Sequence, residues 1–243
     1  MIVGIEAATD CGGVALADAG GRLIAHTWRE SRRPVSTRLL ADLDDLLAGE
    51  GIPSTSLRAV AVSLGPGAFT GLRVGLALAK TLAQGWGVRL YGYSTLAAVA
   101  RRWPVAGETV AVLLDARRSE VYTGIYRSTE DGAPAEVLRE DRVEAVESFL
   151  EAVEGTSPGP LHLAGSGALV YRDLIARRLG DGVRWLPSPW DAPGADALAL
   201  AGAHDWRAGS PGLDPLTAQP VYLRPSDAER RHGPVAFLTW SAV

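Results

Sequence analysis

The chain has 243 residues, of which 47% are hydrophobic and 21% charged, and its formal net charge is −4. This composition supplies enough apolar side chains for a well-filled core and excludes a wholly disordered chain. The acidic balance argues against tight binding of nucleic acid by the chain alone, because neutralising phosphates requires a basic face. We therefore expect any contact with RNA to depend on a partner.

The chain carries a single cysteine, Cys11, which excludes an internal disulfide and a cysteine-based zinc site and fits a reducing cytoplasm. The first residues lack the basic stretch and long apolar run of a signal peptide. No run of about 18 apolar residues is present, so we expect no membrane span. The sequence thus predicts a cytoplasmic protein without membrane contact.

The first half of the chain predicts three short strands in a meander, then helices and strands in alternation. The helix after the meander has recurring leucines, with Ser36 or Thr37 as N-cap and Asp42, Asp44 and Asp45 facing outward. The remaining segments follow from apolar runs bounded by glycine and proline. The predicted strands are 2–7, 14–17, 22–29, 59–64 and 89–93, and the predicted helices are 39–47, 70–84 and 94–101.

The second half repeats this order loosely. Its predicted strands are 109–114, 120–126, 135–141 and 161–164, its predicted helices are 143–153, 169–179 and 195–207, and a short extended piece follows at 220–223. We expect residues 1–103 to form one lobe that carries the partner-binding helices, and residues 104–225 to form a second lobe. Residues 226–243 are expected to be a tail with some mobility.

The most distinctive segment is Ser63–Gly75, where a glycine-rich turn leads from a buried strand into a helix. Such a turn can present backbone N–H groups to an anion, and a plain tight connection explains it at least as well. A phosphate-binding P-loop is excluded, because the Gly-Lys-Ser/Thr ending is absent.

This segment closely resembles the signature of the TsaB (YeaZ-like) family, Gly-Pro-Gly-Ser-Phe-Thr-Gly-hydrophobic-Arg-hydrophobic-Gly, with Ala68 in place of the serine. Glu6 replaces the family's aspartate, and Pro34-Val35 stands where many members have Glu-His. Both departures weaken any claim of chemistry in this chain. The resemblance runs from residue 1 to about 225, and further matching stretches follow in the family's order: Ile5–Thr9, Tyr93–Leu96, Leu114–Tyr122 and Pro220–Arg224.

The resemblance implies an α/β fold of the actin, sugar-kinase and Hsp70 type (ribonuclease H-like), with two lobes that each hold a mixed sheet flanked by helices. It also implies a non-catalytic scaffold or activator in the synthesis of threonylcarbamoyladenosine, beside the anticodon of tRNAs that read codons starting with A. Such a subunit pairs with a TsaD-like transferase, recruits a TsaE-like ATPase and meets tRNA only through the complex. Alone it forms a homodimer and binds no cofactor, and ATP or ADP is expected only at the TsaD interface.

The residues offer little for a catalytic site. His26, His162, His204 and His232 lie far apart, so we expect no metal site and no catalytic residue. Carboxylates that follow apolar strands leave one alternative, an autonomous nucleotide-binding ATPase or small kinase of the same fold. Turn-forming roles explain these residues at least as well. The candidates for a vestigial nucleotide cleft are Asp10, Gly12, Asp115 and Arg117.

The helix predicted at 70–84 is apolar on most sides, so it must be covered on most sides. From the residues alone, the two leucine-rich helices can cover each other and the sheet, or can pair with equivalent helices of another chain. The resemblance favours the second interpretation, a surface for TsaD or for a second copy. The predicted interface residues are Leu39, Leu43, Leu46, Phe69, Leu72, Arg73, Leu76 and Lys80.

Overall fold

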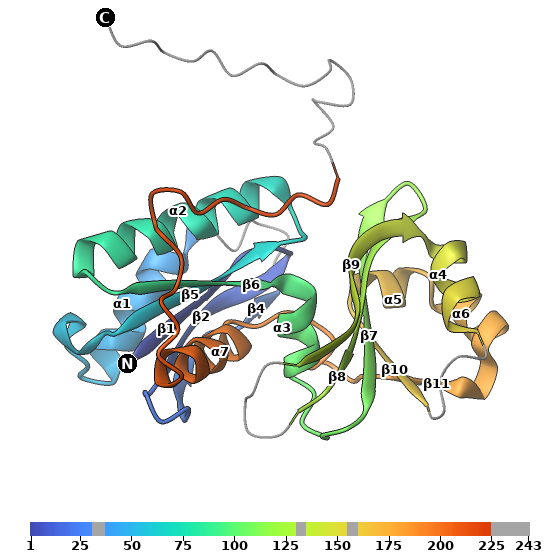
Figure 1. Ribbon diagram of the computed structural model, residues 1–243, viewed down its shortest axis with the longest axis horizontal. Helices are drawn as coiled ribbons and strands as arrows, with labels where there is room; N and C mark the ends of the chain where they lie inside the picture. The colour runs from blue at the N-terminus through green and yellow to red at the C-terminus, as the bar shows by residue number, and fades with distance from the viewer. Residues whose placement is uncertain (31–36, 130–134, 155–159, 225–243) are drawn as a thin grey trace, which may run out of the picture.

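The computed structural model describes residues 1–30, 37–129, 135–154 and 160–224. These residues form two lobes side by side, each built on a mixed sheet with helices against it (Figure 1). The two-lobed α/β fold expected from the resemblance is thereby confirmed. No helix within the described ranges is both long enough and apolar enough to cross a membrane.

The sheet of the first lobe has the strand order β3-β2-β1-β5-β6, with β4 paired to β2. Strand β1 is antiparallel to β2 and parallel to β5. The strands in the middle of this sheet, β1 and β5, are mostly apolar and almost entirely buried, because helices cover both faces. The elements are β1 (Ile2–Glu6), β2 (Cys11–Ala17), β3 (Leu23–His26), β4 (Arg29–Glu30), α1 (Leu39–Gly49), η2 (Ser54–Ser56), β5 (Ala59–Gly65), α2 (Phe69–Trp86), β6 (Arg89–Ser94) and α3 (Thr95–Arg101).

The sheet of the second lobe has the order β11-β10-β7-β8-β9. Strand β7 is antiparallel to β8 and parallel to β10, so the central strand has the same kinds of neighbour as in the first lobe. The loose repeat of elements inferred from the sequence therefore corresponds to two sheets with similar strand connections. The elements are β7 (Thr109–Arg117), β8 (Glu120–Arg127), β9 (Glu136–Ala145), α4 (Val146–Val153), β10 (Leu161–Ala164), α5 (Ser166–Val170), α6 (Arg172–Leu179), η3 (Gly180–Gly182), β11 (Val183–Trp185) and α7 (Ala195–Arg207).

The last helix of each half of the chain packs against the sheet of the other lobe. Helix α3 follows β6 but packs most closely on β7 and β8, whereas α7 follows β11 and packs on β1, β2 and β5 (Figure 1). Gly4 permits this contact, since a Cβ at that position would lie 2.1 Å from the carbonyl oxygen of Ala195. The expected lobe 104–225 therefore differs from the structure, in which α7 belongs with the first sheet.

Residues 213–224, here called the strap, also return to the first lobe. The Leu213 amide donates to the Leu90 carbonyl (2.7 Å), and the Val221 amide donates to the Leu64 carbonyl (2.8 Å). The Nζ of Lys80 donates to the Ala218 carbonyl (3.0 Å). The strap then reaches the second lobe, where Arg224 bonds the Ala116 carbonyl and lies 3.1 Å from a carboxylate oxygen of Glu120.

Several expectations about individual elements need correction. The predicted strand 22–29 is two strands, because the chain bends between β3 and β4. The predicted helix 143–153 begins only at Val146, since residues up to Ala145 continue β9 against β8. The predicted helix 169–179 is two helices, α5 and α6, that meet at Tyr171. Strand β11 was not predicted, and Ser36, one of two suggested N-caps, lies outside the described residues.

Asp42 also differs from the expectation that it faces outward, since it is 1% exposed. Two arginines compensate its charge there. Arg29 donates to both carboxylate oxygens at 2.9 Å, and the Nε of Arg38 lies 3.3 Å from one of them. Asp44 and Asp45 are exposed as predicted.

Candidate functional site

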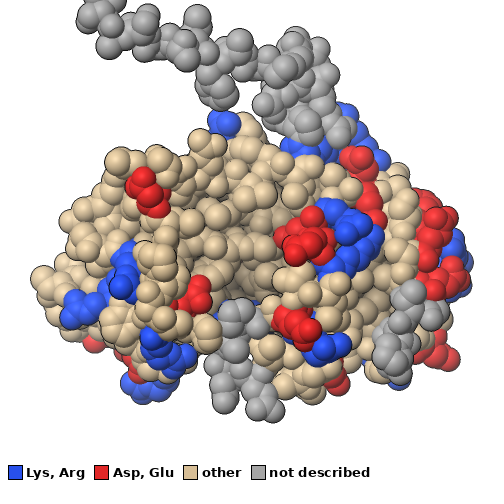
Figure 2. Space-filling model, viewed as in Figure 1, with Lys and Arg blue, Asp and Glu red and all other residues tan. Residues whose placement is uncertain are grey.

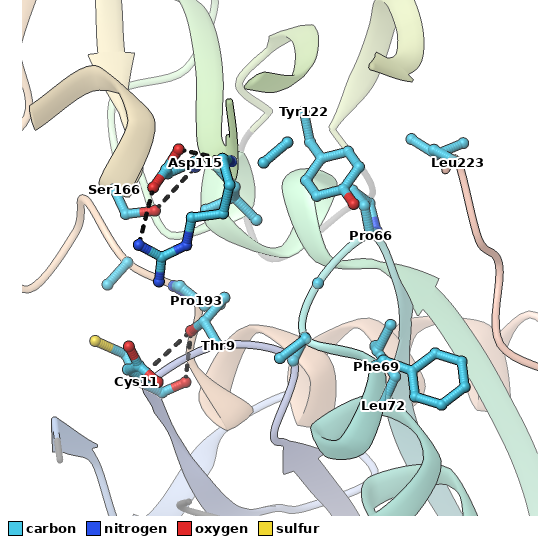
Figure 3. A pocket seen from close by; sticks show the side chains of 18 of the residues that line it. Thr9, Cys11, Pro66, Phe69, Leu72, Asp115, Tyr122, Ser166, Pro193 and Leu223 are labelled. Atoms are coloured by element: carbon cyan, nitrogen blue, oxygen red, sulfur yellow. Dashed lines mark hydrogen bonds and ion pairs between the residues drawn. The ribbon is translucent and has the colours of Figure 1, made fainter. Parts of the chain in front are cut away.

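A cleft of about 600 Å³ separates the two lobes (Figure 3). It lies at the carboxyl ends of the parallel strands, which is where open α/β folds bind ligands. The first lobe contributes the turn after β1 and the glycine-rich turn before α2, and the second lobe contributes the end of β7 and the start of α5. The strap forms one wall, with Val221, Tyr222, Leu223 and Arg224.

Asp115 and Arg117 form the second lobe's side of the cleft. The Arg117 amide donates to an Asp115 carboxylate oxygen at 2.9 Å, and the two side chains lie 3.6 Å apart as an ion pair. Arg117, Arg118 and Ser119 all have positive φ, so the connection between β7 and β8 is a tight left-handed turn. The pair therefore has the turn-forming role that the sequence left open, and its side chains also form an ion pair.

Ser166 lies against the same pair, and sequence reasoning missed it. Its Oγ accepts a hydrogen bond from the Asp115 amide at 3.2 Å. Gly165 before it has φ of 99°, and a Cβ there would lie 2.2 Å from the Leu113 carbonyl oxygen. The stretch Gly165-Ser166-Gly167 between a buried strand and a helix was the available signal, because two glycines around a hydroxyl mark a close backbone approach.

Asp10 and Cys11 lie on the first lobe's side of the cleft. Asp10 is exposed in the turn after β1, whereas Gly12 is buried in β2 and does not line the cavity. Burial raises the pKa of the Cys11 thiol to about 11, so the thiol stays protonated at neutral pH. Cys11 is thus a poor nucleophile.

Carboxylates dominate the charges that line the cleft. Asp10, Glu30, Asp115 and Asp191 all line it, and Arg117 is already paired with Asp115. Arg224 is held by Glu120 and by a carbonyl at the mouth. The cleft is therefore an acidic hollow without a free cation among its described lining side chains, which disfavours a bare polyphosphate.

Glu6, at the end of β1, is fully buried and does not line the cleft. One carboxyl oxygen accepts the Ala8 amide at 2.6 Å, and the other has no hydrogen-bond partner. Burial is the main cause that raises the pKa of Glu6 to about 7, and the charge of Asp196 adds to it. A side chain sealed in this way is not accessible to a ligand in the cleft.

The structure divides the predicted interface residues into two groups. Leu39, Leu43, Leu72 and Leu76 are at most 4% exposed, and they belong to the chain's own core. Their side chains are covered in this structure, and the interface itself stays a prediction. These leucines pack within the first lobe itself, whereas the sequence pattern also allowed them to face a partner.

The other four predicted residues are accessible, but the strap already uses three of them. Arg73 stacks on Phe69 (3.7 Å from its Cζ to the ring centroid), and its Nε donates to the hydroxyl of Tyr222 at 2.9 Å. Phe69 and Tyr222 stack with their centroids 5.3 Å apart, and Lys80 bonds strap carbonyls. Leu46 is half-buried on α1.

Helix α2 nevertheless keeps a solvent-facing side without charge, here called the α2 outer face. It consists of four exposed residues, each about one helical turn from the next: Thr70, Val74, Ala77 and Thr81. Val74 is 40% exposed, and Leu40 on α1 is 59% exposed. Small and β-branched side chains on an exposed helix permit close approach of a second helix.

The histidines that the structure describes are not grouped as metal ligands. His162 is buried beside Trp103, with its Nε2 3.3 Å from a Glu108 oxygen, and His204 lies next to Asp205. No group of three metal-ligating side chains occurs among residues 1–30, 37–129, 135–154 and 160–224. His232 lies outside these ranges.

Two lobes of matching topology, with a cleft at the carboxyl ends of their strands, define a protein of the actin-like fold class. The model of the family described as TsaD, tRNA N6-adenosine threonylcarbamoyltransferase, matches residues 29–178. The chain belongs to this family, and within it to the TsaB (YeaZ-like) group.

Similar proteins place it there. The chain is 37% identical over 133 residues to the tRNA threonylcarbamoyladenosine biosynthesis protein TsaB of Escherichia coli. The matched part covers 54% of this chain and 57% of that protein. It is 28% identical to the TsaB protein of Bacillus subtilis, over 81% of this chain and 82% of that protein. YeaZ from Pseudomonas aeruginosa has the same fold, with a TM-score of 0.74, 27% identity and coverage of 91% and 99%.

Proposed function

We propose that the chain is a non-catalytic subunit in the synthesis of threonylcarbamoyladenosine in tRNA, and that it pairs with a TsaD-like transferase. The observation that carries this proposal is the uncharged α2 outer face, in a chain whose relatives include TsaB proteins of tRNA threonylcarbamoyladenosine biosynthesis. In this proposal the protein acts in the cytoplasm and contributes a surface instead of a reacting group.

The remaining parts of the assembly extend the same proposal. A TsaE-like ATPase joins the pair, ATP or ADP binds at the interface with the TsaD-like subunit, and the chain alone forms a homodimer through the same helix. The homodimer is supported by the small side chains of the α2 outer face, which suit an isologous contact between two copies of α2. Both pairings use one face, so they exclude each other.

The experiment that tests the pairing is co-elution of this chain with a TsaD-like subunit after the substitution Val74→Glu. Val74 is exposed, so the variant folds, but a buried unpaired charge at the interface weakens the complex by roughly 100-fold or more. The matched control is Leu169→Glu on α5, which is also an exposed apolar helix residue. Unchanged co-elution of the Val74 variant would reject the interface, and unchanged tRNA modification without this chain would reject the function.

A second candidate is an ATPase or small kinase that uses the cleft, which is favoured by Asp10 and Asp115 on facing walls. Calorimetry with ATP and magnesium discriminates between the two functions. Tight binding that disappears in Asp10→Asn and Asp115→Asn variants supports the enzyme, whereas no heat of binding supports the subunit.

A further inference from the structure

A second hollow, of about 490 Å³, lies at the end of the first lobe where β5 and β6 begin. This end faces away from the second lobe (Figure 1). Residues of η2, α2, β6 and α7, and of the segments that flank them, surround the hollow. Among them are Ser54, Thr55, Arg58, Trp86, Arg89 and Trp206. Neither the cleft nor the α2 outer face uses these residues.

The charge of this hollow is opposite to that of the cleft. None of the residues that line it is acidic, and both Arg58 and Arg89 are exposed. No carboxylate within the described ranges pairs with either guanidinium, and the Nη1 of Arg58 bonds only the Thr55 and Leu57 carbonyls. Figure 2 shows Lys and Arg side chains gathered toward this outer end of the first lobe. The hollow is therefore a local basic site on an acidic protein.

Two indole rings accompany the charge. Trp86 ends α2 and packs on the core beneath that helix, while Trp206 lies near the end of α7 and packs on the other face of the sheet. Both rings are only partly buried. Partly exposed aromatic rings beside unpaired arginines supply stacking for a base and cations for phosphates, which is how proteins bind unpaired nucleotides.

We propose that this hollow binds an unpaired nucleotide of RNA, with Arg58 and Arg89 on its phosphates and an indole ring against its base. The inference rests on the proposed function, which supplies tRNA as the RNA. Gly85 and Gly87 line the hollow with open space around them, so it is open enough for a chain to enter and leave. The carboxyl end of α2 carries roughly half a negative charge, and two guanidinium groups outweigh it.

The first experiment measures tRNA binding by the assembly of this chain with its TsaD-like partner, at two salt concentrations. The double variant Arg58→Glu/Arg89→Glu is expected to bind about 10-fold or more weakly, with a shallower salt dependence. The control is Arg142→Glu/Arg177→Glu, which makes the same charge change at exposed positions of the second lobe. Equal tRNA affinities of the two double variants would overturn the proposal. It would also be overturned if the Arg58→Glu/Arg89→Glu variant lost binding to the TsaD-like partner while its binding to tRNA was unchanged.

The second experiment uses the isolated chain and tryptophan fluorescence. A 5′-phosphorylated ribotrinucleotide is expected to quench the fluorescence to saturation, and the Arg58→Glu/Arg89→Glu variant and a Trp86→Phe/Trp206→Phe variant are expected to lose this quenching. Equal quenching by adenosine monophosphate would make a free nucleotide the occupant and would overturn the RNA assignment. If the assembly modifies no tRNA, the proposed function fails, and this titration still decides whether the hollow binds RNA.

Discussion

At the scale of single residues, Asp42 shows how a buried charge is stabilised in the first lobe. Its carboxylate is 1% exposed and bonded by Arg29 from β4 and Arg38 from the turn before α1. The hydrogen bond and charge of Arg29 lower the pKa of Asp42 below its usual value. Because the charged form is favoured in the folded state, its contribution to stability is present above the unfolded pKa and is lost as the pH falls.

Replacement of Asp42 by Asn is expected to lower the free energy of unfolding by about 1–2 kcal/mol, since both arginines are about half exposed and solvent already screens part of the attraction. Urea denaturation at pH 7 measures the loss. Asp44→Asn, at an exposed position of the same helix, is expected to change stability by less than about 0.5 kcal/mol. Equal effects at the two positions would contradict the role given to Asp42.

Glu6 shows the opposite behaviour. Its pKa is raised to about 7, so the folded state binds a proton that the unfolded state has released. Its contribution to stability is therefore complete below a pH of about 4.5 and is lost as the pH rises to about 7, a decrease on the order of 3 kcal/mol.

The substitution Glu6→Gln keeps an acceptor for the Ala8 amide and removes the titration. We expect the variant to gain stability relative to the native chain between pH 5 and 8. Urea denaturation at several pH values, taken as the difference between the two proteins, cancels the other titrating groups. A difference that does not change with pH would show that Glu6 is not the titrating group.

At the scale of elements, the strap fastens α2 to both lobes. Its carboxyl-terminal end depends on the stack of Phe69, Arg73 and Tyr222, while its start depends on the backbone bond between Leu213 and Leu90. A Cβ at Gly65 would lie 2.4 Å from the Val221 carbonyl oxygen, so the strap lies directly on the glycine-rich turn.

Tyr222→Ala is expected to free this end of the strap without unfolding α2. Hydrogen exchange at the Val221 amide should speed up by about 10-fold or more, because local opening then exposes its bond to Leu64, while exchange at Leu213 should stay unchanged as an internal reference. Tyr222→Phe, which keeps the stacking and loses only the hydroxyl, should have a smaller effect. Equal acceleration at both amides would mean that the strap opens as one unit.

The elements themselves follow from the sequence wherever apolar periodicity is strong. Strands β1, β5 and β7 each contain a continuous apolar run, and α2 was expected within two residues of its observed ends. The start of α4 was misplaced, because the pattern of Val143 to Ala145 fits a strand edge as well as a helix. Burial of Asp42 depends on arginines that meet it only in three dimensions, and no local pattern shows this.

At the scale of the molecule, exchange of α3 and α7 makes the lobes interdependent. Residues 1–103 lack the helix that covers β1, β2 and β5, so in isolation they expose the apolar face around Ile2, Ala59, Ala61 and Tyr91. We expect the fragment 1–103 to fail to fold alone and to regain a cooperative thermal transition when the peptide 190–224 is added. Circular dichroism measures both states. A cooperative transition of the fragment alone would show that α7 is dispensable.

The cleft could be predicted from the sequence only in part. Asp10 and Asp115 were singled out because each follows an apolar strand, and the structure does bring them to one cavity. Glu30 and Asp191 carry no motif of their own, and they reach the cavity only through the folding of distant segments. The strap residues Val221 to Arg224 belong to a stretch that matches the family, but their place in the wall of the cleft also depends on the fold. The burial of four predicted interface residues was not foreseen, because apolarity reveals that a helix is covered, but not by what.

The helix exchange also has a consequence for how the protein is made. A ribosome releases β1 to β6 well before α7, at roughly 5–20 residues per second, so the first sheet waits uncovered for several seconds. The second sheet is contiguous in the sequence and can be completed earlier, although it begins later. The amino-terminal lobe is thus completed after the second sheet, and an α2 outer face with its final shape appears only on chains that have been synthesised past α7.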